Sequence, residues 1–265
     1  MGGILRLGSV PEGGLRASFR MGRLGRMALG IALCVVLLVL SLEARGQLAM
    51  QRVAMRPTVS GIEKPLLWVV PAVLVASGTV LVNEFGLSGA NVQRMERYSG
   101  WGQPQVRFDD VLQHAPLLLG IFLDVSSDDV PRESLLERFS AKAMGGLAVA
   151  VVVLGVKNFR LAKRPDGEDR DSFMSGHTAT AFLGAELLRL DYGAEYPWVA
   201  AAGYSVAMTT AMFRIWHARH WTGDVVAGAG VGIAAAWVGH YAGMLLADWV
   251  ETRWYGSRAV PMWQY

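Results

Sequence analysis

The chain has 265 residues, a formal net charge of +3, 52% hydrophobic residues, 18% charged residues and a mean hydropathy of +0.31. This composition excludes an intrinsically disordered chain, and it is poor in charge for a soluble domain, in which about a quarter of the residues are charged. The single cysteine, Cys34, excludes a disulfide framework and a multi-thiolate metal site within these residues.

The basic charge is concentrated in the first 46 residues, which carry six arginines and two glutamates. The remainder is close to neutral, which argues against a nucleic-acid-binding surface. Residues 27–42 form an uncharged apolar run that follows Arg23 and Arg26 and precedes Ala44 and Gly46. This pattern predicts a cleaved signal peptide, with an uncleaved first membrane anchor as the alternative. Translation from Met21 would give a leader of ordinary length.

Apolar stretches follow along the rest of the chain. The segments 65–83, 143–156, 178–190, 196–213 and 225–247 predict four or five membrane crossings, since a span needs about 20 residues. We expect segment 111–123 to be interfacial or buried. We also expect the helix of segment 178–190 to begin near Ser175 and to run past Leu190. Glycines four residues apart, Gly228 with Gly232 and Gly239 with Gly243, predict closely packed helices.

These patterns predict an all-α, multi-pass helical membrane protein. We divide the chain into a leader (1–46), an N-terminal membrane and amphipathic region (47–140), a helical core (141–250) and a tail (251–265). Residues 131–139 are expected to form a short amphipathic helix.

Polar residues gather at the ends of three apolar helices. Lys157, Arg164 and Arg214 are cations that can converge on an anion, and guanidinium groups match phosphate oxygens. Ser175 and Gly176 begin a helical segment, whose backbone N–H groups can bind an anion beside His177. His220 and Asp224 lie four residues apart on one helix face, where a carboxylate can orient an imidazole.

The order and spacing of these residues resemble the three-part motif of the type 2 phosphatidic acid phosphatase (PAP2) superfamily. The matching parts are Lys157-x6-Arg164-Pro165, Ser175-Gly176-His177 and Arg214-x5-His220-x3-Asp224. The resemblance covers about residues 141–247 and is closest to a bacterial membrane lipid phosphatase branch. Two positions depart from the family pattern: Met174 stands where proline is usual, and Phe213 where serine is usual.

The resemblance implies a phosphatase with a PAP2/haloperoxidase-like helical core that uses a phosphohistidine intermediate and no metal or cofactor. His220 would attack phosphorus, and Asp224 would hold its other ring nitrogen. His177 would protonate the leaving group and then activate water. The phosphoryl oxygens would be bound by Lys157, Arg164, Arg214, Ser175 and Gly176. His217 is the competing nucleophile, but it lacks an acid four residues later.

Two other classes remain open. One is a soluble-substrate acid phosphatase or vanadium haloperoxidase-like enzyme, and the other is a non-catalytic membrane protein that binds anionic lipids. The expected substrate is phosphatidic acid, phosphatidylglycerol phosphate, a polyprenyl diphosphate or a lipid A phosphate, and no nucleic acid is expected as a partner. If segment 65–83 runs inward and segment 111–123 does not cross, the three motifs meet at the periplasmic face of a bacterial inner membrane. Residues 166–171 are expected to form a solvent-facing loop or the rim of the site.

Overall fold

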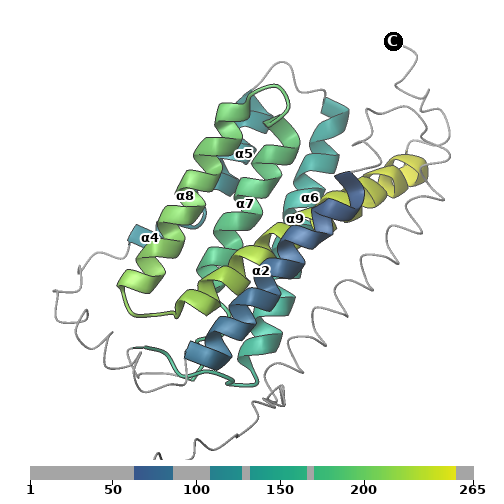
Figure 1. Ribbon diagram of the computed structural model, residues 1–265. Coiled ribbons are helices and arrows are strands. Elements are labelled where there is room, and N and C mark those ends of the chain that lie inside the picture. The colour runs from purple at the N-terminus through teal and green to yellow at the C-terminus, as the bar shows by residue number, and fades with distance from the viewer. Residues whose placement is uncertain (1–62, 86–107, 127–131, 166–169, 255–265) are drawn as a thin grey trace, which may run out of the picture.

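The computed structural model describes residues 63–85, 108–126, 132–165 and 170–254, and this part of the chain contains helices and no strand (Figure 1). The predicted all-α class is confirmed. The helices are α2 (Glu63–Phe85), α4 (Phe108–Leu112), α5 (Ala115–Ser126), α6 (Arg132–Lys157), α7 (Gly176–Tyr192), α8 (Pro197–Trp216) and α9 (Thr222–Trp254). The predicted leader lies outside the described residues.

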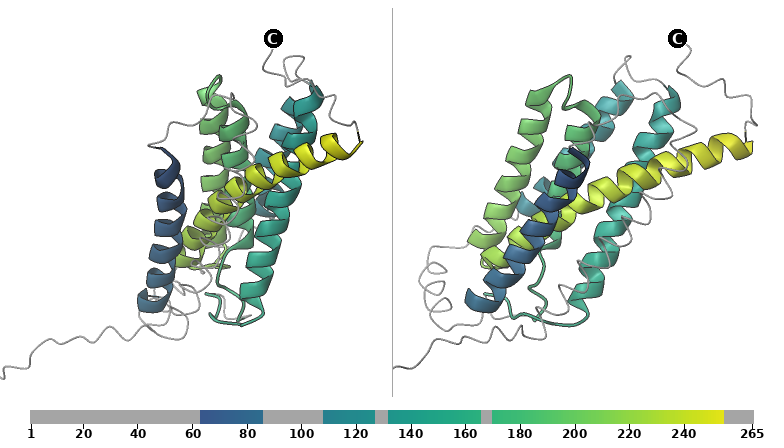
Figure 2. Two further views of the ribbon diagram at one scale, coloured as in Figure 1. Left: turned by 90° about the vertical axis from the view of Figure 1, so that its right-hand side faces the viewer. Right: turned by 45° about the vertical axis from the view of Figure 1, so that its right-hand side comes forward.

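Helix α9 is the central element, and it crosses the other helices obliquely (Figure 2). It packs against α2, α6 and α7 through its glycines. A methyl group on Gly228 would lie 2.6 Å from the Ser175 carbonyl oxygen, and one on Gly243 would lie 2.5 Å from the Ala141 nitrogen. Side chains larger than hydrogen would therefore separate these helices, which confirms the close packing predicted from the glycine spacing.

The three polar clusters lie at one end of the bundle, which we call the motif end. Helix α6 ends there, and α7 and α9 begin there. Helix α2 also ends there, because a methyl group on Gly223 would lie 2.6 Å from Val82 Cγ2. Helix α5 runs from the motif end to the opposite end, since Asp110 of α4 contacts His177 and Asp124 of α5 contacts Tyr192.

This course corrects the expected chain path. We expected α2 to begin on the side of the motifs and segment 111–123 to stay at one face. The structure places the end of α2 at the motif end and lays α4 and α5 along α7. The 12 residues of α5 rise only about 18 Å, which made the segment look too short to travel the length of the bundle. The break at Gln113 and His114 separates it from α4, which adds the missing length.

Two helices of the described chain are long and apolar enough to cross a membrane, at Leu135–Lys157 and Thr222–Val250. Trp68–Val82 forms a shorter apolar helix. Helix α7 begins after a Ser175 cap and ends at Tyr192, as expected. The predicted amphipathic helix is not separate, because from Arg132 onward it forms the first turns of α6.

Candidate active site

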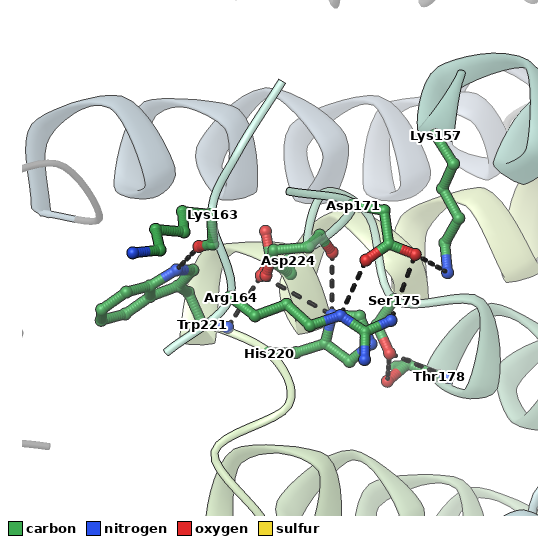
Figure 3. Close-up of polar contacts among 10 residues, drawn as sticks. Lys157, Lys163, Arg164, Asp171, Ser175, Thr178, His220, Trp221 and Asp224 are labelled. Carbon is green, nitrogen blue, oxygen red and sulfur yellow. Dashed lines mark hydrogen bonds and ion pairs between the residues drawn. The ribbon is translucent and has the colours of Figure 1, made fainter. Parts of the chain in front are cut away.

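Every residue expected to catalyse the reaction or bind phosphate lies at the motif end. Lys157 ends α6, and Arg164 lies in the loop that follows. Ser175 caps α7, and its hydroxyl oxygen accepts a hydrogen bond from the Thr178 backbone nitrogen at 3.4 Å. Arg214 lies in the last turn of α8, whereas His220 and Asp224 flank the start of α9. Figure 3 labels Lys157, Arg164, Ser175, His220 and Asp224 and marks polar contacts in this region.

The His220 ring is almost fully buried and has a defined orientation. Its Nδ1 lies 2.8 Å from the backbone carbonyl oxygen of Ser172. A carbonyl oxygen only accepts hydrogen bonds, so Nδ1 carries the proton and the neutral ring has its lone pair on Nε2. Burial, the largest influence, lowers the pKa of His220 below the usual value and outweighs the opposing effect of Asp224. The ring is therefore held neutral with Nε2 as the basic atom.

Asp224 acts on this ring less directly than expected. Its Oδ2 atom lies 3.7 Å from His220 Nδ1, which is beyond hydrogen-bond length. The same oxygen accepts hydrogen bonds from the Ser172 hydroxyl at 2.5 Å and the Trp221 backbone nitrogen at 2.8 Å. Ser172 thus connects the carboxylate to the imidazole, because its hydroxyl binds the first and its carbonyl binds the second.

Two of the three expected phosphate-binding cations share one carboxylate. The Arg164 guanidinium donates to Asp171 through Nε at 2.8 Å and Nη2 at 3.2 Å, and Lys157 Nζ lies 3.8 Å from the same side chain (Figure 3). Burial acting alone would raise the pKa of Asp171, but Arg164 and then Lys157 lower it below the usual value. Asp171 is therefore an ionised partner of both cations.

The third cation, Arg214, is paired by a residue of α4. Its Nη1 atom lies 2.5 Å from Asp109 Oδ2 and 3.7 Å from Asp110 Oδ1. The Asp109 side chain is fully buried, and its Oδ1 atom lies 3.2 Å from His217 Nδ1. His217, which we treated as lacking an acid, therefore has one from a distant part of the chain.

His177 contacts the other acid of α4. Its Nε2 atom lies 2.8 Å from Asp110 Oδ1, and its side chain is 26% exposed. His177 is the second residue of α7 and lies before the apolar part of that helix, which begins at Thr178. Burial first and Arg214 second lower the pKa of His177 to about 4, although Asp110 opposes both. The ring is neutral at pH 7 when no anion is bound, and a bound phosphate dianion would raise its pKa.

Part of the chain that forms this arrangement is similar to a known protein family. Residues 139–246 match the PAP2 superfamily. The matched region covers less than half of the chain. It is 36% identical over 145 residues to a protein named "Lipid A 1-phosphatase" from Porphyromonas gingivalis, and the match covers 55% of this chain and 33% of that protein. The chain thus spans about a third of the length of this relative.

A solved structure is also similar to the chain. The "Crystal structure of Aquifex aeolicus LpxE" shares 22% sequence identity, with a TM-score of 0.42. The similarity covers 58% of this chain and 97% of that one.

The sequence analysis missed the two acids that α4 brings to the region matching the PAP2 superfamily. Asp109 and Asp110 precede the matched region by about 30 residues. The only sequence signal is a pair of acids directly before an apolar run. Of the expected loop at 166–171, residues 166–169 lie outside the described residues. The side chain of Asp171 is 33% exposed, which places it at the rim of the site, and it also forms ion pairs with Arg164 and Lys157.

Three of these residues offer potential metal ligands. One atom each of Asp109, Asp110 and His177 lies within 4.8 Å of the others. Arg214 contacts both carboxylates, so its positive charge opposes a cation at this position. The donor set therefore fits the guanidinium better than it fits a metal ion.

Proposed function

We propose that this chain is a membrane phosphatase that hydrolyses a phosphorylated lipid through a phosphohistidine intermediate. The observation that carries the proposal is the His220 ring, buried and oriented so that Nε2 holds the lone pair. A histidine nucleophile needs this tautomer, because the attacking nitrogen cannot carry a proton. The PAP2 domain match and the identity to a lipid phosphatase support the same reaction.

The proposed reaction has two steps. In the first, His220 Nε2 forms a bond to phosphorus while the bond to the lipid oxygen breaks, and His177 donates a proton to the departing oxygen. In the second, His177 takes a proton from water, which attacks phosphorus and releases inorganic phosphate with the restored imidazole. Lys157, Arg164 and Arg214 bind the equatorial oxygens, where negative charge must be stabilised in both transition states. Ser175 and Gly176 contribute the start of α7.

The proposed substrate is a lipid A phosphate. Of the four lipid phosphates that the motif allows, this is the one that the name of the 36% identical relative supports. Phosphatidic acid, phosphatidylglycerol phosphate and a polyprenyl diphosphate are the comparison substrates. Release of phosphate from soluble esters alone would favour a soluble-substrate enzyme, and binding without release would favour a lipid-binding protein.

We further propose that the bundle is multi-pass in a bacterial inner membrane, with its motif end at the periplasmic face. Because α2 runs toward the motif end, this orientation requires Glu63 to lie on the cytoplasmic side. The predicted leader, cleaved or not, would instead place Glu63 in the periplasm, so a periplasmic motif end and that leader are alternatives that one labelling experiment decides. Cysteines placed at Arg170 and Glu195 in a Cys34→Ala background, labelled in intact cells with an impermeant maleimide, test the orientation. Labelling at residue 170 alone supports a periplasmic site.

The catalytic proposal is tested by comparing His220→Ala with His217→Ala in the purified full chain. His220→Ala should reduce lipid phosphate release below a few per cent and abolish the acid-labile phosphoenzyme, because no other basic nitrogen replaces Nε2. His217→Ala should retain the phosphoenzyme. The reverse pattern would assign the nucleophile to His217, and normal turnover by both variants would overturn the covalent mechanism.

A further inference from the structure

The three cations expected to bind phosphate already lie close to carboxylates. Lys157, Arg164 and Arg214 lie among four of them: Asp109, Asp110, Asp171 and Asp224. A phosphate dianion that approaches these cations meets groups whose charges are already compensated. Binding would therefore be strengthened if at least one carboxylate gave up its contacts.

The four carboxylates differ in how easily they can give up their contacts with the cations. Asp109 and Asp224 are fully buried. Besides the cations, Asp109 contacts His217, and Asp224 accepts hydrogen bonds from the Trp221 backbone nitrogen and the Ser172 hydroxyl. Asp110 is 43% exposed but is committed to His177. Asp171 is 33% exposed, and the side-chain contacts described for it go only to Arg164 and Lys157. It is therefore the carboxylate that can leave at least cost.

The backbone around Asp171 is held while its side chain reaches solvent. Asp171 forms a bridge with Ala162, in which the Ser172 nitrogen donates to the Ala162 carbonyl oxygen at 3.1 Å. Rotation about the Asp171 side-chain bonds can move the carboxylate without moving this loop. Its two oxygens contact Arg164 in the paired geometry that a phosphate group would use. Figure 3 shows the carboxylate between Arg164 and Lys157.

We propose that Asp171 is an internal competitor of the substrate phosphate, a binding-determining residue that occupies Arg164 and Lys157 until an anion displaces it. The proposal rests on the proposed function for its biological meaning, because it concerns how the phosphatase binds substrate and releases product. A single carboxylate charge yields to a dianionic phosphate ester bound to the same two cations. When inorganic phosphate leaves, the Asp171 carboxylate contacts Arg164 and Lys157 again, which keeps the affinity for the product low.

A charge-neutral substitution tests the proposal directly. Asp171→Asn keeps the shape of the side chain but removes its charge, so the dissociation constant for inorganic phosphate should fall about tenfold, equivalent to ~1.4 kcal/mol. The measurement is phosphate titration of the purified full chain by calorimetry, with inhibition by phosphate during turnover as a second readout. Glu195→Gln is the matched control, because Glu195 is exposed at the opposite end, and its affinity for phosphate should be unchanged.

A structural role for Asp171 predicts the opposite result. If the carboxylate mainly positions Arg164 and Lys157, Asp171→Asn should bind phosphate more weakly, and unchanged affinity would equally overturn the competition. Thermal unfolding adds a separate readout: without phosphate the variant should be less stable, and saturating phosphate should raise its melting temperature more than it does for the unsubstituted chain. Asp171→Ser repeats the test with a smaller side chain. Tighter phosphate binding in a chain that turns over no lipid would support the competitor and overturn the proposed function.

Discussion

The two ends of this bundle each carry a cluster of acids and bases, and the two clusters differ in exposure. At the opposite end, Asp124 contacts Arg138 at 3.0 Å, Lys142 at 2.7 Å and the Tyr192 hydroxyl at 2.7 Å. The Asp124 side chain is 0% exposed and that of Lys142 is 5% exposed. At the motif end, the side chains of Asp171 and Asp110 are 33% and 43% exposed.

The comparison separates a permanent ion cluster from a replaceable one. At the opposite end, α5, α6 and α7 surround the charges, and each acid is matched by a base from a neighbouring helix. Displacing one partner there leaves a charge buried. At the motif end, water reaches Asp110 and Asp171, and an anion can take the place of Asp171. The same kinds of residues therefore support the fold at one end and ligand exchange at the other.

The largest effect should come from His177→Ala at the motif end. Loss of a general acid costs about 10²- to 10⁴-fold, and the loss should be greatest for a lipid alkoxide, which leaves poorly without a proton. An activated aryl phosphate should form phosphoenzyme nearly as fast as before and then accumulate it, because water loses its base. Rapid-quench measurement of labelled phosphoenzyme checks both substrates. Equal slowing of formation with the two leaving groups would limit His177 to binding phosphate.

A smaller and different effect is expected from Asp124→Asn at the opposite end. It removes the central acid of a buried cluster and leaves Lys142 partly uncompensated, so the free energy of unfolding should fall by about 3–5 kcal/mol. Activity per folded molecule should be unchanged. The measurement is denaturation in detergent together with phosphate release, with Asp248→Asn, at an exposed position of α9, as the control. A selective loss of activity without loss of stability would contradict the division between the ends.

The smallest effect should come from Asp110→Asn, which tests a positioning residue. The carboxylate opposes the burial and the Arg214 charge that lower the pKa of His177 to about 4. Removing it should lower this pKa further, and the protonated fraction at pH 7 should fall about tenfold each time the pKa falls by one. The alkaline limb of kcat/KM should therefore move to lower pH, as seen in a pH–rate profile. An unchanged limb with lower activity at every pH would mean that Asp110 acts only on structure.

Local pattern predicted the residues that lie within a few positions of one another. The helix that starts near Ser175 and the proximity of His220 to Asp224 follow from short spacings along the chain, although these two side chains lie 3.7 Å apart. The partners supplied by other elements could not be predicted in this way. Asp109 meets Arg214 across 105 positions, and the Ser172 carbonyl meets His220 across 48. Backbone carbonyls leave no trace in residue identity, and a pair of acids before an apolar run is common.

The predicted path of the chain through the bundle was wrong for a related reason. Counting apolar residues assigns a crossing to each long run, and one short helix changes every later assignment. Helix α5 has 12 residues, with Leu118, Phe122 and Val125 exposed on its outer face and Gly120 packed against Leu188. Its packing on α7, which composition does not report, determines its direction. Composition likewise does not separate exposed from buried tryptophans: Trp198, Trp216 and Trp249 are exposed, whereas Trp221 is buried and donates to the Lys163 carbonyl oxygen.

The position of α4 sets the smallest fragment that can retain this arrangement. The family match begins at residue 139, yet Asp109 and Asp110 lie on α4, and Asp124, which anchors the opposite end, lies on α5. A recombinant fragment cut at residue 139 would keep every residue of the three-part motif. It would nevertheless lack the acids that hold Arg214 and contact His177, and it would leave Lys142 without Asp124. The functional unit of this protein therefore begins upstream of its recognisable domain, at Phe108 or earlier.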